Sequence, residues 1–215
     1  SSAASDVYKR QVYNIVRFIE RNNQMTVQSI AVFMGAQFGN DPQYTVIAEK
    51  LGQIIAEKKL KLVYGGGRDG LMGATALSTM AHGGEVIGIT PNNLAEDAIS
   101  PEQVTRLIEV DNMSERKDLM MRYADAFVVL PGGFGTLEEL AQVLSWAKIG
   151  LHDKPLVLLN INGFYDSLWA WLKETVTNGF VAEHELQHVQ IFDNIDDTLA
   201  YMNQFNLLIH ETNDY

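Results

Sequence analysis

The 215-residue chain contains no cysteine. This absence excludes disulfide bonds, thiolate metal sites and a cysteine nucleophile. Long apolar runs are also missing, and none approaches the roughly 20 residues that a transmembrane helix needs. Residues 1–6 lack the basic and then apolar layout of a secretory signal. From these absences we expect a cytoplasmic protein that does not associate with a membrane.

Positive charge is scarce as well. The chain has 16 lysine and arginine residues against 27 aspartate and glutamate residues, which gives a formal net charge of −11. A nucleic-acid polymer would meet a repulsive surface outside any local basic pocket. DNA and RNA are therefore not expected as partners, whereas a small anion held in a cleft is compatible with this charge.

Hydrophobic residues make up 47% of the chain, enough to bury a full core, and the length suits one domain spanning residues 1–215. Short apolar runs alternate with segments of helical periodicity. This alternation predicts an α/β fold, with a Rossmann-like, mainly parallel sheet covered by helices on both faces. The expected strands are 29–34, 61–64, 86–89, 104–110, 126–130, 154–159 and 189–192, and the expected helices are 42–59, 71–81, 114–123 and 164–177.

Three segments stand apart from this alternation. A helix is expected at 7–22 as an N-terminal addition, and residues 181–215 form a C-terminal tail whose expected role is packing. Residues 92–103 show little periodicity and predict a surface connection with one helical turn. Loops of this length in a compact domain are often functional.

The most informative segment is Pro-Gly-Gly-Phe-Gly-Thr-Leu-Glu-Glu at 131–139, between a buried strand and a helix. Its glycines, Gly132, Gly133 and Gly135, would leave backbone N–H groups free at a helix N-terminus, where a phosphate binds well. The hydroxyl of Thr136 is a further phosphate donor, and Glu139 would face the same ligand one turn later. The alternative is a plain turn that needs glycine for its backbone angles. The number of glycines together with the threonine favours phosphate binding.

Two upstream segments carry weaker signals. The turn Gly65-Gly66-Gly67 lacks both the dinucleotide fingerprint and the lysine of a P-loop, so a flexible connection remains an equal alternative. Arg116 and Lys117 lie at the start of a helix, where cations oppose the helix dipole. Either they belong to a solvated helix face or they face the ligand anion.

The sequence His-Glu-Leu-Gln-His at 184–188 matches the zinc-protease pattern H-E-x-x-H. A third histidine at the required spacing is missing, and a strand follows at once. We therefore do not expect a metal site here or elsewhere in the chain.

Taken together, the motifs resemble those of the Lonely Guy (LOG) family, with the same order and spacing over roughly residues 30–180. The resemblance is carried by segments 64–73, 114–117, 131–139, 146–155 and 160–165. It implies a phosphoribohydrolase that cuts the N-glycosidic bond of a cytokinin riboside 5′-monophosphate or of AMP, releasing the base and ribose 5-phosphate. It also implies a homodimer and a reaction without a cofactor. The name "lysine decarboxylase" that many members carry is not supported, because Lys117 and Lys148 lack the setting of a Schiff-base lysine.

The resemblance further implies that Arg116 and Glu139 are the catalytic pair and that the 131–136 turn holds the 5′-phosphate. Glu139 would stabilise positive charge on the sugar and orient or deprotonate water, while Arg116 would keep this carboxylate ionised. Lys117 and Met113 are assigned to the binding site, with 65–67 as a second glycine turn. The sequence departs from the family at Ala36-Gln37 and at Ser114, which leaves base preference open. The alternative function is a nucleotide-binding module without catalysis.

Overall fold

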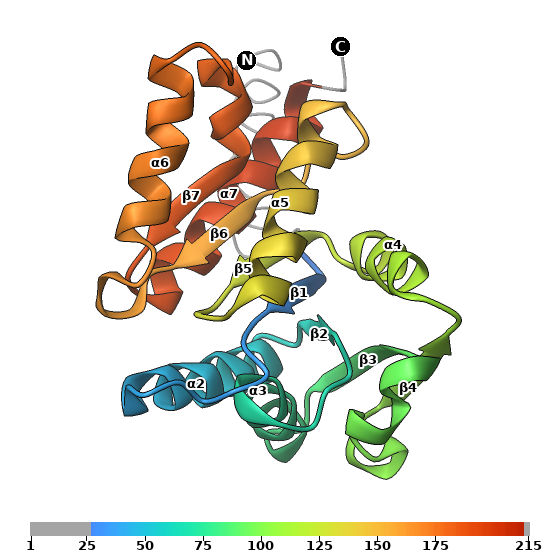
Figure 1. Ribbon diagram of the computed structural model, residues 1–215. Helices are drawn as coiled ribbons and strands as arrows, with labels where there is room; N and C mark the ends of the chain where they lie inside the picture. Colours follow the sequence, from blue (N-terminus) through green and yellow to red (C-terminus); the bar gives the residue numbers. More distant parts are fainter. Residues whose placement is uncertain (1–26, 213–215) are drawn as a thin grey trace, which may run out of the picture.

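The structure of the protein is a computed structural model that describes residues 27–212 (Figure 1). The helix expected at 7–22 lies outside the described residues. The strands are β1 (Ser29–Phe33), β2 (Lys61–Tyr64), β3 (Glu85–Pro91), β4 (Arg106–Val110), β5 (Ala126–Val129), β6 (Leu156–Leu159) and β7 (Val189–Phe192). The α-helices are α2 (Pro42–Glu57), α3 (Gly70–Ala81), α4 (Met113–Tyr123), α5 (Phe134–Lys148), α6 (Asp166–Thr177) and α7 (Ile195–Thr212).

The seven strands form one sheet in the order β4-β3-β2-β1-β5-β6-β7, and every neighbouring pair is parallel. Helices cover both faces of this sheet. Side chains of α2, α3 and α7 contribute to the core on one face, and side chains of α4, α5 and α6 contribute to the core on the other. The predicted α/β fold with a mainly parallel sheet is confirmed.

The central strand β1 shows why its sequence forms a strand buried on both sides. Its side chains alternate, with Ile30 and Val32 in the core under α2 and Ala31 and Phe33 in the core under α4 and α5. The ring of Phe33 stacks on that of Phe127 in the adjacent β5. An unbroken apolar run is therefore what a central parallel strand requires.

The chain reverses direction at the middle of the sheet. It proceeds outward from β1 to β4 and then returns to place β5 on the other side of β1. The connections that leave β1 and β5 consequently diverge, which opens a crevice beyond their carboxyl ends, where ligands bind in folds of this type. A hydrogen bond from Gly35 N to Pro131 O (3.0 Å) joins the two connections at the base of this crevice.

The connection between β3 and β4 differs from the sequence-based expectation. Expected to hold one helical turn, it contains two 3₁₀ helices, η1 (Asn92–Asp97) and η2 (Pro101–Gln103), and β4 starts at Arg106. After residue 181 the chain supplies the predicted strand β7 and the helix α7, and Leu199 and Met202 of α7 are buried. Among the described helices, none combines the length and apolar content needed to cross a bilayer.

Candidate active site

The glycine-rich turn joins β5 to α5, as the sequence predicts. Gly133 is the N-cap residue of α5, and among the described residues no side chain caps this helix start. A Cβ atom at Gly133 or at Gly135 would meet nothing within 4 Å. The first turn of α5 therefore presents free N–H groups to open space, and these two glycines keep that space clear of side chains.

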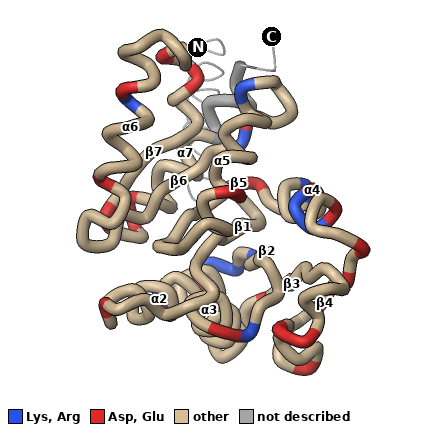
Figure 2. The backbone as a smooth tube through the Cα atoms, viewed as in Figure 1, with Lys and Arg blue, Asp and Glu red and all other residues tan. Residues whose placement is uncertain are grey.

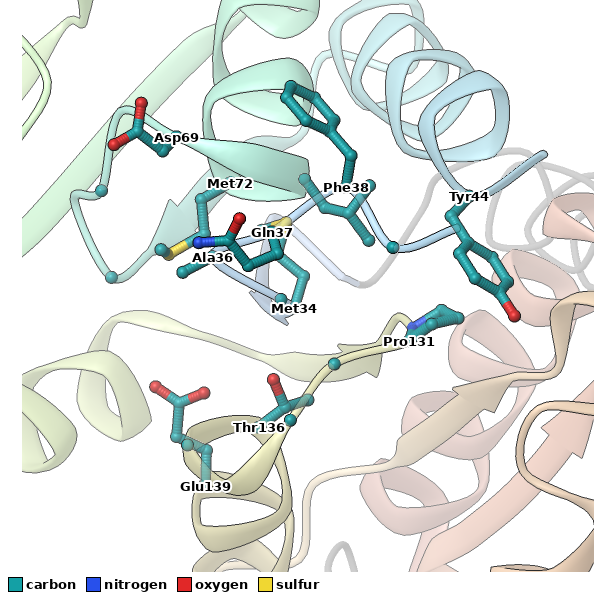
Figure 3. A pocket seen from close by; sticks show the side chains of 18 of the residues that line it. Met34, Ala36, Gln37, Phe38, Tyr44, Asp69, Met72, Pro131, Thr136 and Glu139 are labelled. Atoms are coloured by element: carbon teal, nitrogen blue, oxygen red, sulfur yellow. The ribbon is translucent and has the colours of Figure 1, made fainter. Parts of the chain in front are cut away.

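Gly132 and Thr136 fit against each other within this turn. A Cβ at Gly132 would overlap the hydroxyl of Thr136, so the close approach depends on glycine. Thr136 is buried, yet its hydroxyl forms no hydrogen bond within the described part of the chain. Figure 3 shows this hydroxyl and the carboxylate of Glu139 pointing from α5 toward the loop of Ala36 and Gln37.

Arg116 approaches the same space from α4. Asn112 caps this helix by accepting a hydrogen bond from Glu115 N (3.0 Å), which leaves Arg116 one turn inside the helix start. The guanidinium donates from Nε to the carbonyl of Ile89 (3.2 Å) and from Nη1 to Sδ of Met113 (3.0 Å). The cation thus points inward from the helix rather than lying on its solvated face.

Arg116 and Glu139 form an ion pair, with 3.3 Å between Nη2 and Oε1 and about one-tenth of each side chain exposed. Burial raises the pKa of Glu139 from its usual 4.5 to about 7, although Arg116 and Lys117 act to lower it. Arg116 therefore acts toward the ionised form of this carboxylate, in the expected direction, and burial acts against it.

These groups line one cavity of about 690 Å³. Of the residues predicted for the site, it brings together Gly65, Gly67, Arg116, Gly132, Gly133, Gly135, Thr136 and Glu139. Asp69 and Met72 lie on the opposite side of the cavity (Figure 3). The position of the cavity, beyond the ends of β1 and β5, matches the crevice that the strand order creates.

Gly66, Lys117 and Met113 do not line the cavity. Lys117 forms an ion pair with Glu138, so it fastens α4 to α5 beside the Arg116–Glu139 pair. The blue positions of α4 face the red start of α5 in Figure 2. Met113 contacts the guanidinium of Arg116 instead of the open space.

A family model described as "Possible lysine decarboxylase" matches residues 72–202. "Probable cytokinin riboside 5'-monophosphate phosphoribohydrolase LOG4" of Oryza sativa is 36% identical, over 88% of this chain and 83% of that protein. "Cytokinin riboside 5'-monophosphate phosphoribohydrolase LOG2" of Arabidopsis thaliana is 44% identical, over 71% of this chain and 72% of that protein. The chain belongs to the LOG family.

Solved structures agree with the fold of this LOG family member. The Moco carrier protein of Chlamydomonas reinhardtii superposes with a TM-score of 0.62 at 23% identity, covering 83% of this chain and 97% of that one. The molybdenum cofactor binding protein of Rippkaea orientalis gives 0.59 at 23% identity, covering 89% and 100%. Similarity at this level concerns the fold alone.

Sequence reasoning missed several residues of the cavity, which come from the ends of β1 and β3 and from η1. They include Met34, Thr90, Leu94 and Asp97. None belongs to a glycine-rich motif, so local pattern gave no signal for them. Ligands bind beyond the carboxyl ends of parallel strands, and this rule would have indicated Thr90, the second-last residue of β3.

The zinc-type pattern is not built as a zinc site. Its residues form the 3₁₀ helix η4 (Glu183–His188), in which positions four apart do not share a face. His184 is exposed, and Glu185 pairs with Lys148 (3.2 Å). Within residues 27–212, no group of three or more histidine, aspartate or glutamate side chains is placed to hold a metal ion.

Proposed function

We propose that the protein hydrolyses the N-glycosidic bond of a purine nucleoside 5′-monophosphate, of the cytokinin type or AMP, to the free base and ribose 5-phosphate. Its relatives carry the name of this activity. The observation that carries the proposal is the position of a buried carboxylate, Glu139, in the same cavity as an uncapped helix start. The helix start can bind an anion, and Glu139 can act on an atom of the ligand next to that anion.

The 5′-phosphate binds at the start of α5. Free N–H groups and the positive end of the helix dipole favour an anion there, and the unpaired hydroxyl of Thr136 donates to a phosphate oxygen. The empty volume beside Gly133 and Gly135 receives the phosphate oxygens. Binding energy gained at the phosphate then fixes the sugar relative to Glu139.

Glu139 acts on the sugar carbon C1′. When the bond to the base nitrogen breaks, its electron pair leaves with the base and positive charge develops on the sugar, which the carboxylate stabilises. Water bonds to C1′, and Glu139 removes its proton. The proton that water loses balances the one that the departing base gains. Only the ionised form of Glu139 can perform this role.

Arg116 orients the reacting carboxylate. Its guanidinium is fixed by the carbonyl of Ile89 and by Met113, and from this position it holds Oε1 of Glu139. The same cation lowers the pKa of Glu139 against the larger effect of burial. A lysine could not form this set of directed contacts, because it lacks the planar array of donors.

The direct test is incubation of the purified protein with AMP, isopentenyladenosine monophosphate, GMP and CMP, with free base measured by chromatography. Glu139→Ala is the blank. We expect the purine nucleotides to release base and the blank to release none. Absence of base from all four nucleotides would refute the proposal.

The alternative is a module that binds a nucleotide without reaction. A pure binder gains nothing from a carboxylate near a phosphate, so in that case Glu139→Gln would bind AMP more tightly and no product would form. A lysine decarboxylase is disfavoured because no lysine is among the described residues that line the cavity. Release of cadaverine from lysine and pyridoxal phosphate would reverse this conclusion.

A homodimer is part of the same proposal. Large apolar side chains are exposed along α5 and the turn after it, among them Leu137, Ile149 and Leu151, and such surfaces are typical of protein interfaces. Sedimentation equilibrium should give twice the monomer mass, and a monomer would contradict the proposal. A cytoplasmic location remains a prediction from the sequence.

A further inference from the structure

Thr90 at the end of β3 is a buried polar residue that no motif accounts for. It lines the cavity and is 2% exposed, and its hydroxyl forms no hydrogen bond within the described residues. The fully buried unpaired side-chain atoms of the described residues are the hydroxyl of Tyr64 and Nδ1 of His188, so the hydroxyl of Thr90 is not one of them and reaches the cavity surface. The cavity is the space from which a partner can come.

The backbone around Thr90 is fixed. Gly66 has a positive φ of 74°, and a Cβ there would lie 3.1 Å from Cβ of Thr90, so the adjacent turn packs directly on this side chain. Hydrogen bonds from Ile99 N to Gly66 O (2.8 Å) and from Arg68 N to Asp97 O (3.1 Å) connect this turn to the segment after β3. Thr90 is therefore held in a rigid wall of the cavity.

This wall lies far from the phosphate site. In the strand order, β3 is three strands away from β5, which at the usual strand spacing corresponds to about 14 Å. Arg116 lies between the two, because it bonds the carbonyl of Ile89, the neighbour of Thr90, and also reaches Glu139 on α5. A nucleotide with its phosphate at α5 and its sugar at Glu139 thus directs its base toward Thr90.

We propose that the hydroxyl of Thr90 hydrogen-bonds the nucleobase and is a specificity residue of the site. This inference rests on the proposed function, because it takes the orientation of the nucleotide from it. A threonine hydroxyl both donates and accepts. Asp97 lines the same cavity, and its carboxylate can accept a hydrogen bond. The base edge therefore meets polar groups here, whereas the phosphate meets backbone N–H groups at the opposite end.

The test compares Thr90→Val, which keeps the shape and removes the hydroxyl, with Thr90→Ser, which keeps the hydroxyl. KM and kcat are measured with AMP, and ribose 5-phosphate, which has no base, serves as a competitive inhibitor. We expect Thr90→Val to raise KM for AMP about tenfold, the factor for one lost hydrogen bond, with the loss mainly in KM. The inhibition constant of ribose 5-phosphate should stay within twofold for both variants, and Thr90→Ser should retain the wild-type KM.

An unchanged KM in Thr90→Val would overturn the inference, and so would an equal rise in the inhibition constant, which would place the contact on the sugar. A structural role predicts instead that Thr90→Val lowers the denaturation midpoint, whereas loss of an unpaired hydroxyl should leave it unchanged or raise it. If the wild type releases no base from AMP, the proposed function fails. In that case calorimetric titration measures the Kd of AMP for the wild type and for Thr90→Val. A Kd about tenfold higher in Thr90→Val supports the role of Thr90, and an equal Kd overturns it.

Discussion

A methyl group at Gly65 would collide with Nη2 of Arg116, the same nitrogen that pairs with Glu139. Gly65, directly after β2, therefore leaves the space that the guanidinium of Arg116 occupies. This contact explains a glycine in the second turn without any phosphate binding at that position. It also links two motifs that lie about fifty residues apart in the sequence.

Gly65→Ala should therefore displace Arg116 and lower kcat/KM for AMP nearly as much as Arg116→Ala does. Because the obstructing atoms belong to the end of a flexible side chain, the fold should tolerate the change. We expect a loss of at least tenfold in kcat/KM with less than about 1 kcal/mol of lost unfolding free energy. The double variant Gly65→Ala/Arg116→Ala should be no worse than Arg116→Ala alone, and additive losses would contradict the shared mechanism.

Gly135→Ala should separate stability from binding. Residue 135 lies in the first turn of α5 with open space around it, so alanine should stabilise the helix by up to about 1 kcal/mol. The added methyl group occupies volume assigned to the phosphate, and KM for AMP should rise. Chemical denaturation and steady-state kinetics measure the two effects. Unchanged KM together with higher stability would show that the phosphate binds elsewhere.

The raised pKa of Glu139 predicts opposite pH trends in activity and stability. Activity should rise with pH and level off above about 7, because the ionised carboxylate is the active form. In the unfolded chain this group ionises near 4.5, whereas in the folded protein it keeps its proton up to about 7. Its contribution to stability is thus fully present below pH 4.5 and decreases between 4.5 and 7, by about 3 kcal/mol in total.

Glu139→Gln provides the control for this trend, since the amide does not titrate. The difference in unfolding free energy between wild type and Glu139→Gln, measured from pH 4 to 8, should change across that window in favour of the variant. A difference independent of pH would show that the carboxyl group has an ordinary pKa in the folded protein.

Tyr165 should act on the site through the backbone. Its hydroxyl donates to the carbonyl of Leu130 (2.7 Å), directly before the glycine-rich turn, and both residues are buried. Tyr165→Phe leaves that carbonyl without a donor, and we expect a loss of about 1–3 kcal/mol in stability together with a raised KM for AMP. Tyr201→Phe is the matched control, because Tyr201 makes a similar bond to the carbonyl of Gln187 (2.8 Å) outside the cavity. Equal effects of both variants on KM would exclude a specific role for Tyr165.

The sequence was most informative where function depends on local backbone geometry. The turn at Gly132, Gly133 and Gly135 needs short-range features only, namely an apolar strand, glycines and a helix, and all are adjacent in the chain. The strands at 61–64 and 189–192 were predicted with their observed bounds for the same reason. The ion pair of Arg116 with Glu139 became predictable through the family resemblance.

Features that depend on distant packing were not predictable. Lys117 follows Arg116 directly, yet the helix turns it toward Glu138 while Arg116 enters the cavity. The raised pKa of Glu139 arises from burial, which a motif does not encode. Thr90 belongs to no motif, and which residues it meets in the cavity depends on the order of strands that are not neighbours in sequence.

The reversal of strand order has an evolutionary consequence. Because it distributes the cavity over several stretches of chain, the part that would bind the phosphate follows β5, while the part that would meet the base is encoded between β2 and β4. Substitutions in one part do not change the residues of the other. Under the proposed orientation, a lineage can therefore change its preferred nucleotide while its anchoring and cleavage apparatus is inherited unaltered.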